Sequence, residues 1–195
     1  MSRPATRIPA FDELYRQIEA LPEGVTGEIL EPGVVRTMAR PGGRHRFAGW
    51  RARRALQGSD LAEGGSGWWF EVEAEIKLPD GLLAVPDLSG WRVTEEPPFV
   101  DANPIEVLPD FCCEVLSPTT ARDDRRLKLP LFARSGVGWT WIVDPDLCTV
   151  EVYQTVETLA ALVLVAKDDD VLILPPFEDE IDVGRFWKAR AAATR

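Results

Sequence analysis

Hydrophobic positions along the chain change period several times, and each change predicts a new element. Residues 9–21 carry apolar side chains at helical spacing and predict a short amphipathic helix. The stretch VTGEILEPGVVRTM, residues 25–38, predicts a hairpin, because Pro32-Gly33 separates two runs rich in β-branched and apolar residues. Residues 41–56 then fit one apolar helical face, and arginines occupy much of the remaining surface of this second predicted helix.

A strict period of two follows in WWFEVEAEIKLP, residues 68–79, where apolar residues alternate with charged ones. This pattern predicts one long strand with a buried face and a solvated face. Pro79-Asp80-Gly81 turns the chain back into LLAVPDLSGWRV, so we expect a second hairpin whose returning strand carries Asp87. Residues 94–109 hold four prolines and predict an extended connection.

The run FCCEVL, residues 111–116, predicts a short buried strand with a single acid inside it. Because side chains alternate along a strand, Cys112, Glu114 and Leu116 should share one face. A carboxylate in such a place is unfavourable by several kcal/mol unless it is paired or bound to a metal. Glu114 is therefore a candidate site residue, although an edge-strand acid facing water is the alternative.

A helix is expected from the hydroxyl-rich segment Ser117-Pro118-Thr119-Thr120 to about Arg134, with Gly136 as its stop. Pro130 removes one backbone hydrogen bond and should kink this helix just after Lys128. Asp123 and Asp124 are interpreted as first-turn acids favoured by the helix dipole. Further strands are predicted between residues 138 and 175, and a short helix and tail end the chain.

Charge is divided by region. The chain of 195 residues has a formal net charge of −10, yet residues 1–57 hold ten arginines and six acids, and residues 58–195 hold twelve bases and twenty-six acids. One run of bases contains no acid, and a second is interrupted only by Asp123 and Asp124; the runs are Arg40, Arg44, Arg46, Arg51, Arg53, Arg54 and Arg122, Arg125, Arg126, Lys128, Arg134. They either flank a polyanion site or form solvated helix faces.

The seven tryptophans show no spacing that indicates base stacking, and most are expected in the core.

Length and composition are typical of one globular domain over residues 1–195, with residues 9–21 and 183–195 as extensions. No apolar run is long enough for a membrane span or a secretory signal, so a cytoplasmic protein is expected. Three cysteines, two of them adjacent at Cys112 and Cys113, favour reduced thiols over a disulfide framework.

Two acids and a lysine on consecutive predicted elements suggest a metal site. Asp87 ends one apolar run, Glu114 lies inside the next, and Lys128 follows on the helix. One Asp and one Glu on adjacent strands would hold Mg²⁺ or Mn²⁺, and the carbonyl of Val115 is a third candidate ligand. The alternatives are a turn residue at Asp87 and a solvated lysine paired with Asp124.

The blocks PDLS, PDFCCEVLSP, RRLKLPLFARSGV and WIVDP resemble the Uma-two family of the PD-(D/E)XK nuclease superfamily, in order over about residues 11–154. The resemblance implies that Asp87 and Glu114 bind the metal and that Lys128 is the catalytic lysine. In the plain superfamily pattern the lysine stands two residues after the second acid, but Leu116 occupies that position here. The lysine has therefore moved to the next helix.

The same resemblance implies a site role for Glu28, the acid of the early hairpin. His45 matches a histidine that opens the following helix, where it would pack, cap the helix or shuttle a proton. The implied fold is an α/β (α+β) restriction-endonuclease-like core, a central mixed β-sheet flanked by helices. The implied activity is metal-dependent endonuclease hydrolysis of DNA phosphodiester bonds.

A homodimer is expected because a duplex has two antiparallel strands and two-fold symmetry is the commonest in oligomers. Two alternatives remain open: a catalytically inactive nucleic-acid-binding or regulatory module, and a dimeric scaffold with the same fold.

Overall fold

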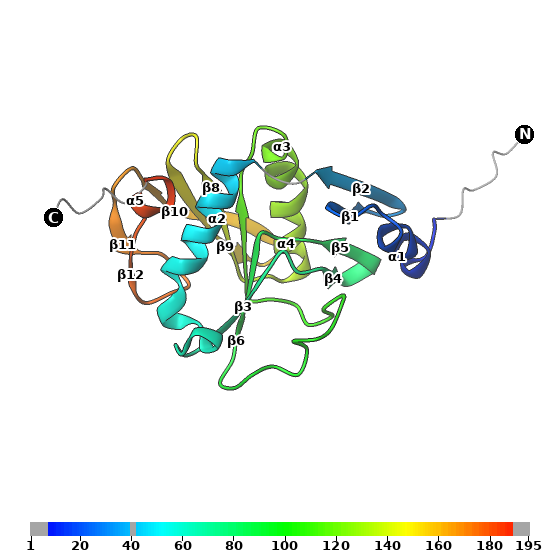
Figure 1. Ribbon diagram of the computed structural model, residues 1–195, viewed down its shortest axis with the longest axis horizontal. Coiled ribbons are helices and arrows are strands. Elements are labelled where there is room, and N and C mark those ends of the chain that lie inside the picture. The colour runs from blue at the N-terminus through cyan, green and yellow to red at the C-terminus, as the bar shows by residue number, and fades with distance from the viewer. Residues whose placement is uncertain (1–7, 40–41, 189–195) are drawn as a thin grey trace, which may run out of the picture.

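Figure 1 shows the computed structural model of the chain, which describes residues 8–39 and 42–188. A six-stranded sheet has the strand order β10-β9-β8-β7-β6-β3, a four-stranded sheet has the order β2-β1-β5-β4, and β11 pairs with β12. The helices are α1 (Phe11–Glu19), α2 (Gly43–Ala55), α3 (Ala121–Asp123), α4 (Leu129–Ser135) and α5 (Gly184–Trp187), with a π-helical turn η4 (Asp124–Lys128) between α3 and α4 and short 3₁₀ turns at Gln57–Ser59, Leu61–Glu63 and Pro79–Gly81. The strands are β1 (Val25–Glu31), β2 (Val34–Ala39), β3 (Trp68–Val72), β4 (Ile76–Leu78), β5 (Leu82–Ala84), β6 (Leu88–Arg92), β7 (Phe111–Val115), β8 (Trp139–Asp144), β9 (Thr149–Val156), β10 (Leu159–Lys167), β11 (Val171–Ile173) and β12 (Glu180–Asp182).

The large sheet is mixed, as expected. Strand β7 runs parallel to β8 and antiparallel to β6, whereas the other neighbours in this sheet are antiparallel. A parallel neighbour requires a crossover connection, and the helical segment from α3 to α4 provides it. A central mixed sheet flanked by helices is thus confirmed.

Side-chain alternation along β7 separates the two faces of the sheet. Phe111, Cys113 and Val115 belong to the hydrophobic cluster that includes residues of α2 and α5. Cys112 belongs to a second cluster, which includes residues of α4, α1 and the small sheet. The two faces predicted for this strand are confirmed, and in Figure 1 α2 crosses in front of the large sheet.

The long strand predicted for residues 68–79 is wrong, because the chain breaks it into β3 and β4 at Glu73, where φ is 52°. The returning strand of the predicted hairpin is interrupted too, between β5 and β6. As a result β3 pairs with β6 in the large sheet, and β4 pairs with β5 in the small sheet. One hairpin is therefore shared by two sheets. Asp87 lies in the break between β5 and β6, where its carbonyl accepts a hydrogen bond from the Glu73 amide.

The predicted helix after β7 begins at Ala121 and ends at Gly136, whose φ of 98° places it in the left-handed region. The expected irregularity near Pro130 is the π-helical turn that ends at Lys128. Pro130 has no N–H to donate to the preceding turn, and π turns inside helices are frequent at functional sites.

The N-terminal helix and hairpin lie where they were predicted, as α1 and as β1 with β2. Helix α2 confirms the basic helix, but Arg40 of its run lies outside the described residues, as do residues 189–195 of the predicted tail. Residues 94–109 form no strand beyond a single bridge from Ile105 to Ile76. In the described part of the chain, no helix combines the length and the apolar character that a membrane crossing requires.

Candidate active site

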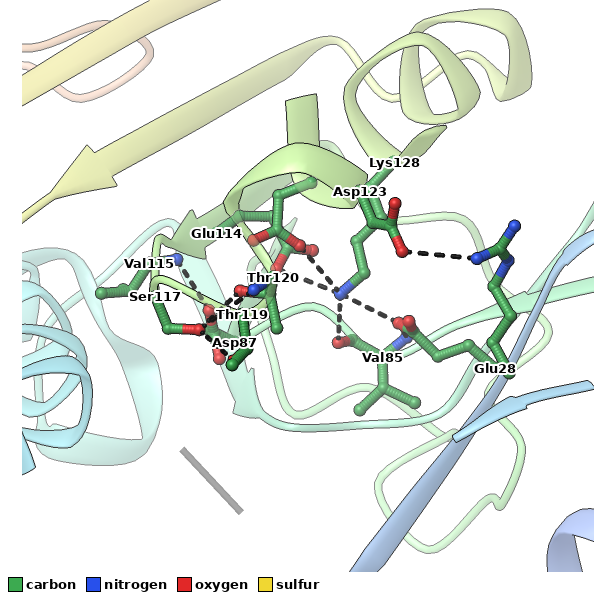
Figure 2. A network of polar contacts seen from close by, with 12 residues as sticks. Glu28, Val85, Asp87, Glu114, Val115, Ser117, Thr119, Thr120, Asp123 and Lys128 are labelled. Atoms are coloured by element: carbon green, nitrogen blue, oxygen red, sulfur yellow. Dashed lines mark hydrogen bonds and ion pairs between the residues drawn. The ribbon is translucent and has the colours of Figure 1, made fainter. Parts of the chain in front are cut away.

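The Lys128 ammonium group occupies the meeting point of the two sheets and the helix. Its Nζ lies 2.9 Å from Glu28 Oε1, 3.2 Å from Glu114 Oε2 and 3.8 Å from Asp124 Oδ1. It also donates a hydrogen bond to the carbonyl of Val85 at 3.3 Å. Figure 2 shows the ammonium group between the Glu28 and Glu114 carboxylates. The solvated lysine considered as the alternative is wrong, since only 3% of the side chain is exposed.

Glu28 reaches this point from β1. Its Oε1 also accepts a hydrogen bond from the Val85 amide at 2.8 Å. The backbone N–H of Val85 thus donates to Glu28, and the backbone carbonyl of Val85 accepts from Lys128. These contacts tie the small sheet to the helix that follows β7.

Burial governs the protonation of this cluster. It raises the pKa of Glu114 well above the ordinary carboxyl range, and the Lys128 charge offsets only part of this effect. It also raises the pKa of Asp124 to about 6, against the opposing effects of Lys128 and the Thr120 hydroxyl. Burial opposes the charged form of Lys128, but the Glu114, Glu28 and Asp124 carboxylates outweigh it and raise the pKa of the amine. Lys128 is therefore a cation at neutral pH.

Asp87 is oriented by two contacts to the same oxygen. Its Oδ2 accepts a hydrogen bond from the Val115 amide at 2.7 Å and lies 3.1 Å from His45 Nε2. Burial lowers the pKa of His45, but the hydrogen bond and charge of Asp87 outweigh it, so the pKa is raised. His45 lies in the first turn of α2, where its side chain is buried and makes no cap hydrogen bond. Its polar contact is with Asp87.

Asp87, Glu114, Asp124 and Lys128 line one cavity of about 60 Å³. A neighbouring cavity of about 760 Å³ is also lined by His45, Asp124 and Lys128, and Glu28 forms part of its wall. Both cavities are bordered by Ser117, Thr119 and Thr120. The Ser117 Oγ lies 3.0 Å from each of the two threonine hydroxyl oxygens. Of the hydroxyls predicted to cap the helix, that of Ser117 accepts a hydrogen bond from the Thr120 amide at 3.3 Å, whereas the Thr120 side chain makes no cap bond and instead bonds to Asp124.

The donor set fits a divalent cation of the Mg²⁺ type. Glu114 Oε1 and Asp124 Oδ2 are buried, and neither has a hydrogen-bond partner among the described residues. An anionic oxygen without a partner is unfavourable in the protein interior, and a bound cation would satisfy it. Within residues 8–39 and 42–188, no three His, Cys, Asp or Glu side chains are arranged as a metal cluster. Mg²⁺ is commonly bound by one or two carboxylates and keeps several waters, so this arrangement suffices for it.

Residues 11–184 match the model of Uma2, a family described as "Putative restriction endonuclease". The chain belongs to the Uma2 family. Among solved structures, the chain is similar to a nuclease of the DUF820 family from Anabaena variabilis, described as putative, with 20% identity and a TM-score of 0.69. The alignment covers 92% of this chain and 97% of that one, and at this identity it shows the fold alone. No curated protein matches the chain.

The fold thus brings together Glu28, Asp87, Glu114 and Lys128, the four residues that this Uma2 family member was expected to use. Sequence reasoning missed Asp124, which it had interpreted as a dipole acid. A signal was available, since Asp124 is four residues before Lys128 and therefore on the same side of a helix. No comparable signal pointed to the Asp87 contact of His45, because these residues are far apart in the chain.

Proposed function

We propose that this protein is a metal-dependent endonuclease that hydrolyses DNA phosphodiester bonds. The observation that carries the proposal is the buried Lys128 ammonium held beside Glu114, with Asp87 lining the same cavity. Membership of the Uma2 family and the nuclease-like fold support a nuclease. The DNA substrate and the metal requirement are our inference from this site.

Asp87 and Glu114 would hold Mg²⁺ or Mn²⁺. Such an ion supplies Lewis-acid chemistry, which activates water and stabilises charge on phosphoryl oxygens. The Val115 amide and His45 Nε2 both contact Oδ2 of Asp87, so Oδ1 would be the oxygen that binds the cation. Asp124 would add negative charge beside the ion.

Lys128 acts as a hydrogen-bond donor in this proposal. Burial opposes the charged form of the amine, but the neighbouring carboxylates raise its pKa, so the metal-free site holds Lys128 as an ammonium group. A fixed cation would orient the attacking water and stabilise the charge that develops on the phosphate. Glu28 would hold this cation in place through its 2.9 Å contact.

The test is nicking of supercoiled plasmid with and without Mn²⁺. Glu114→Gln keeps the side-chain shape and removes a proposed ligand. Its rate should fall by about 100-fold or more, since even outer-shell partners of metal sites contribute about 10- to 100-fold. The matched control is Glu106→Gln, which alters an exposed acid paired with Lys77 and should cut like wild type. Undiminished cleavage by a folded Glu114→Gln protein would refute the assignment.

A second candidate is a non-catalytic nucleic-acid-binding module. The absence of a three-residue metal cluster among the described residues favours it, because Lys128 could then be a structural tie between the sheets. The affinity for Mn²⁺ distinguishes the nuclease from the non-catalytic module. The nuclease should bind Mn²⁺ through Asp87 and Glu114, and calorimetry on Glu114→Gln should show weaker binding. A wild-type protein with neither Mn²⁺ binding nor cleavage would be this module.

Cleavage of both strands of a duplex would be served by a two-fold homodimer. The terminal strand β10 of the large sheet exposes several apolar side chains: Leu159, Leu162, Val163 and Val165. Phe186, in the C-terminal helix α5, is fully buried and offers no such surface. We therefore assign the dimer contact to β10.

A further inference from the structure

One side of helix α2 carries aromatic and arginine side chains that do not belong to the hydrophobic core. Ala48 and Ala52 on the inner side are buried in the core. Phe47, Trp50, Arg51 and Arg54 recur at spacings of three and four and therefore share the outer side. Trp50 is 56% exposed, although a large aromatic side chain is normally placed in the core. Most of the tryptophans were expected in the core, and Trp50 is an exception.

Two guanidinium groups are held against the Trp50 ring. The Cζ atoms of Arg51 and Arg54 lie 5.0 and 5.7 Å from its ring centroid. Arg51 is also 5.1 Å from the Phe47 ring centroid. Cation–π contacts of this kind fix the positions of charged groups without neutralising them.

These two arginines keep their charge available. Arg53 of the same helix is paired with Asp60 and Glu63, and Arg44 is paired with Asp146 at 2.8 Å. Within residues 8–39 and 42–188, by contrast, neither Arg51 nor Arg54 takes part in a salt bridge. The sequence of α2 contains no acid at all. An anionic partner is therefore the complement of this face.

A hollow beside the indole offers room for a ring system. It has a volume of about 230 Å³ and is lined by Trp50, Arg53, Arg54, Gln57 and Glu63. The same helix begins at the candidate active site, since His45 in its first turn contacts Asp87. The 13 residues of α2 span about 20 Å, so the aromatic face continues away from the site along one rigid element.

We propose that this α2 face binds an unpaired nucleic-acid strand, with a base stacked on Trp50 and phosphates bound by Arg51 and Arg54. The proposal rests on the nuclease function and specifies its substrate as DNA with a single-stranded segment next to the cleaved bond. Base faces are hidden in an intact duplex and are accessible in unstacked strands. A purely electrostatic duplex site would need the arginines alone.

A second copy of the chain is the competing partner, because residues 58–195 hold twenty-six acids and twelve bases. If the face joined two copies, substitution of Trp50 would change the oligomeric mass and leave nucleic-acid binding intact. Light scattering on the same samples distinguishes these results.

The experiment measures binding of a fluorescent oligothymidylate by anisotropy in EDTA, where cleavage does not interfere. Trp50→Ala should weaken binding by about 5- to 150-fold, as expected for one stacked base, and Trp50→Phe should restore most of it. In Trp50→Ala, the slope of log K for oligonucleotide binding against log salt concentration should equal that of wild type. In Arg54→Ala it should flatten by about 0.7 unit, the value for one phosphate on a single strand.

The matched control is Val107→Ala, since Val107 is 48% exposed and lies in the connection between β6 and β7, outside both α2 and β10. It should bind the oligonucleotide like wild type. Equal binding by Trp50→Ala and wild type would overturn the proposal, and so would equal weakening of Trp50→Ala on blunt duplex and single strand. Neither result would affect the nuclease assignment, which depends on Glu114→Gln in the plasmid assay.

Discussion

At the scale of single residues, the candidate site concentrates charge in a buried place. Lys128 is the only base in contact with the carboxylates of Glu28, Glu114 and Asp124 among the described residues. Burial favours the neutral form of each acid, while Lys128 favours the ionised form. The acids exceed the single ammonium group, so the metal-free site is destabilised by repulsion at pH values where they ionise.

Asp124→Asn should remove part of this repulsion. The pKa of Asp124 is raised from its ordinary 3.8 to about 6, so the folded protein binds this proton more tightly than the unfolded chain does. Its contribution to stability is fully present below about pH 4 and is lost as the pH rises through about 6. In EDTA at pH 7, Asp124→Asn should therefore unfold with a free energy about 1–3 kcal/mol higher than wild type, as measured by urea denaturation.

Asp123→Asn is the control for this measurement, because the Asp123 side chain is 48% exposed and pairs with Arg36. It should retain the wild-type loss of stability between pH 4 and 6. A wild-type protein whose stability rises over this range would contradict the account of Asp124.

At the scale of elements, two irregularities place the site residues. The shared break in the hairpins puts Val85 and Asp87 between the two sheets, where they are free of regular ladder pairing. The π-helical turn carries Asp124 and Lys128 and lies directly before Pro130. Glu28 reaches Lys128 from β1, and Ile18 and Leu21 pack closely against β1 at the neighbouring Gly27.

Gly27→Ala tests that packing. A Cβ at this position would lie 2.7 Å from Ile18 Cγ1 and 2.9 Å from Leu21 Cδ1. Overpacking of this kind should lower the free energy of unfolding by about 1–3 kcal/mol and displace Glu28. Gly43→Ala is the matched control, since nothing lies within 4 Å of the added atom, and it should be neutral or stabilising by up to about 1 kcal/mol. Equal stability of the two variants would show that α1 moves freely on β1.

At the scale of the whole molecule, charge and apolar surface are separated. The basic face lies on α2, in front of the large sheet, and the apolar residues of β10 lie at one edge of that sheet. If the protein binds nucleic acid as proposed, its acidic body would limit non-specific contact and direct binding to the basic α2 face. The exposed edge of a sheet is also a site where a second copy can pair.

The homodimer predicts a mass of twice 21.7 kDa by light scattering. Leu162→Lys on β10 should give the monomer mass, because it places a charge on an apolar edge where the side chain is 53% exposed. Leu147→Lys, at a 69% exposed position in the β8–β9 turn, should keep the wild-type mass. A wild-type monomer at micromolar concentration would exclude the β10 dimer.

The sequence by itself determined the first hairpin, the two faces of β7 and the candidacy of Glu114 as a site residue. These features follow from short-range periodicity, because a strand with period two must place Glu114 opposite Phe111, Cys113 and Val115. The order of the predicted elements added Asp87 and Lys128, and the family resemblance supplied the mixed-sheet fold and the remaining candidate, Glu28.

Only the tertiary structure decided what each of these residues touches. Alternation predicted one strand through Glu73, but the packing of two sheets broke it and placed Asp87 in the gap. Asp124 became a site residue when its helix face met Glu114, and Trp50 stayed exposed because small residues fill the opposite side of α2. Periodicity specifies the direction of a side chain, whereas its neighbours come from distant segments whose arrangement depends on the packing of the entire core.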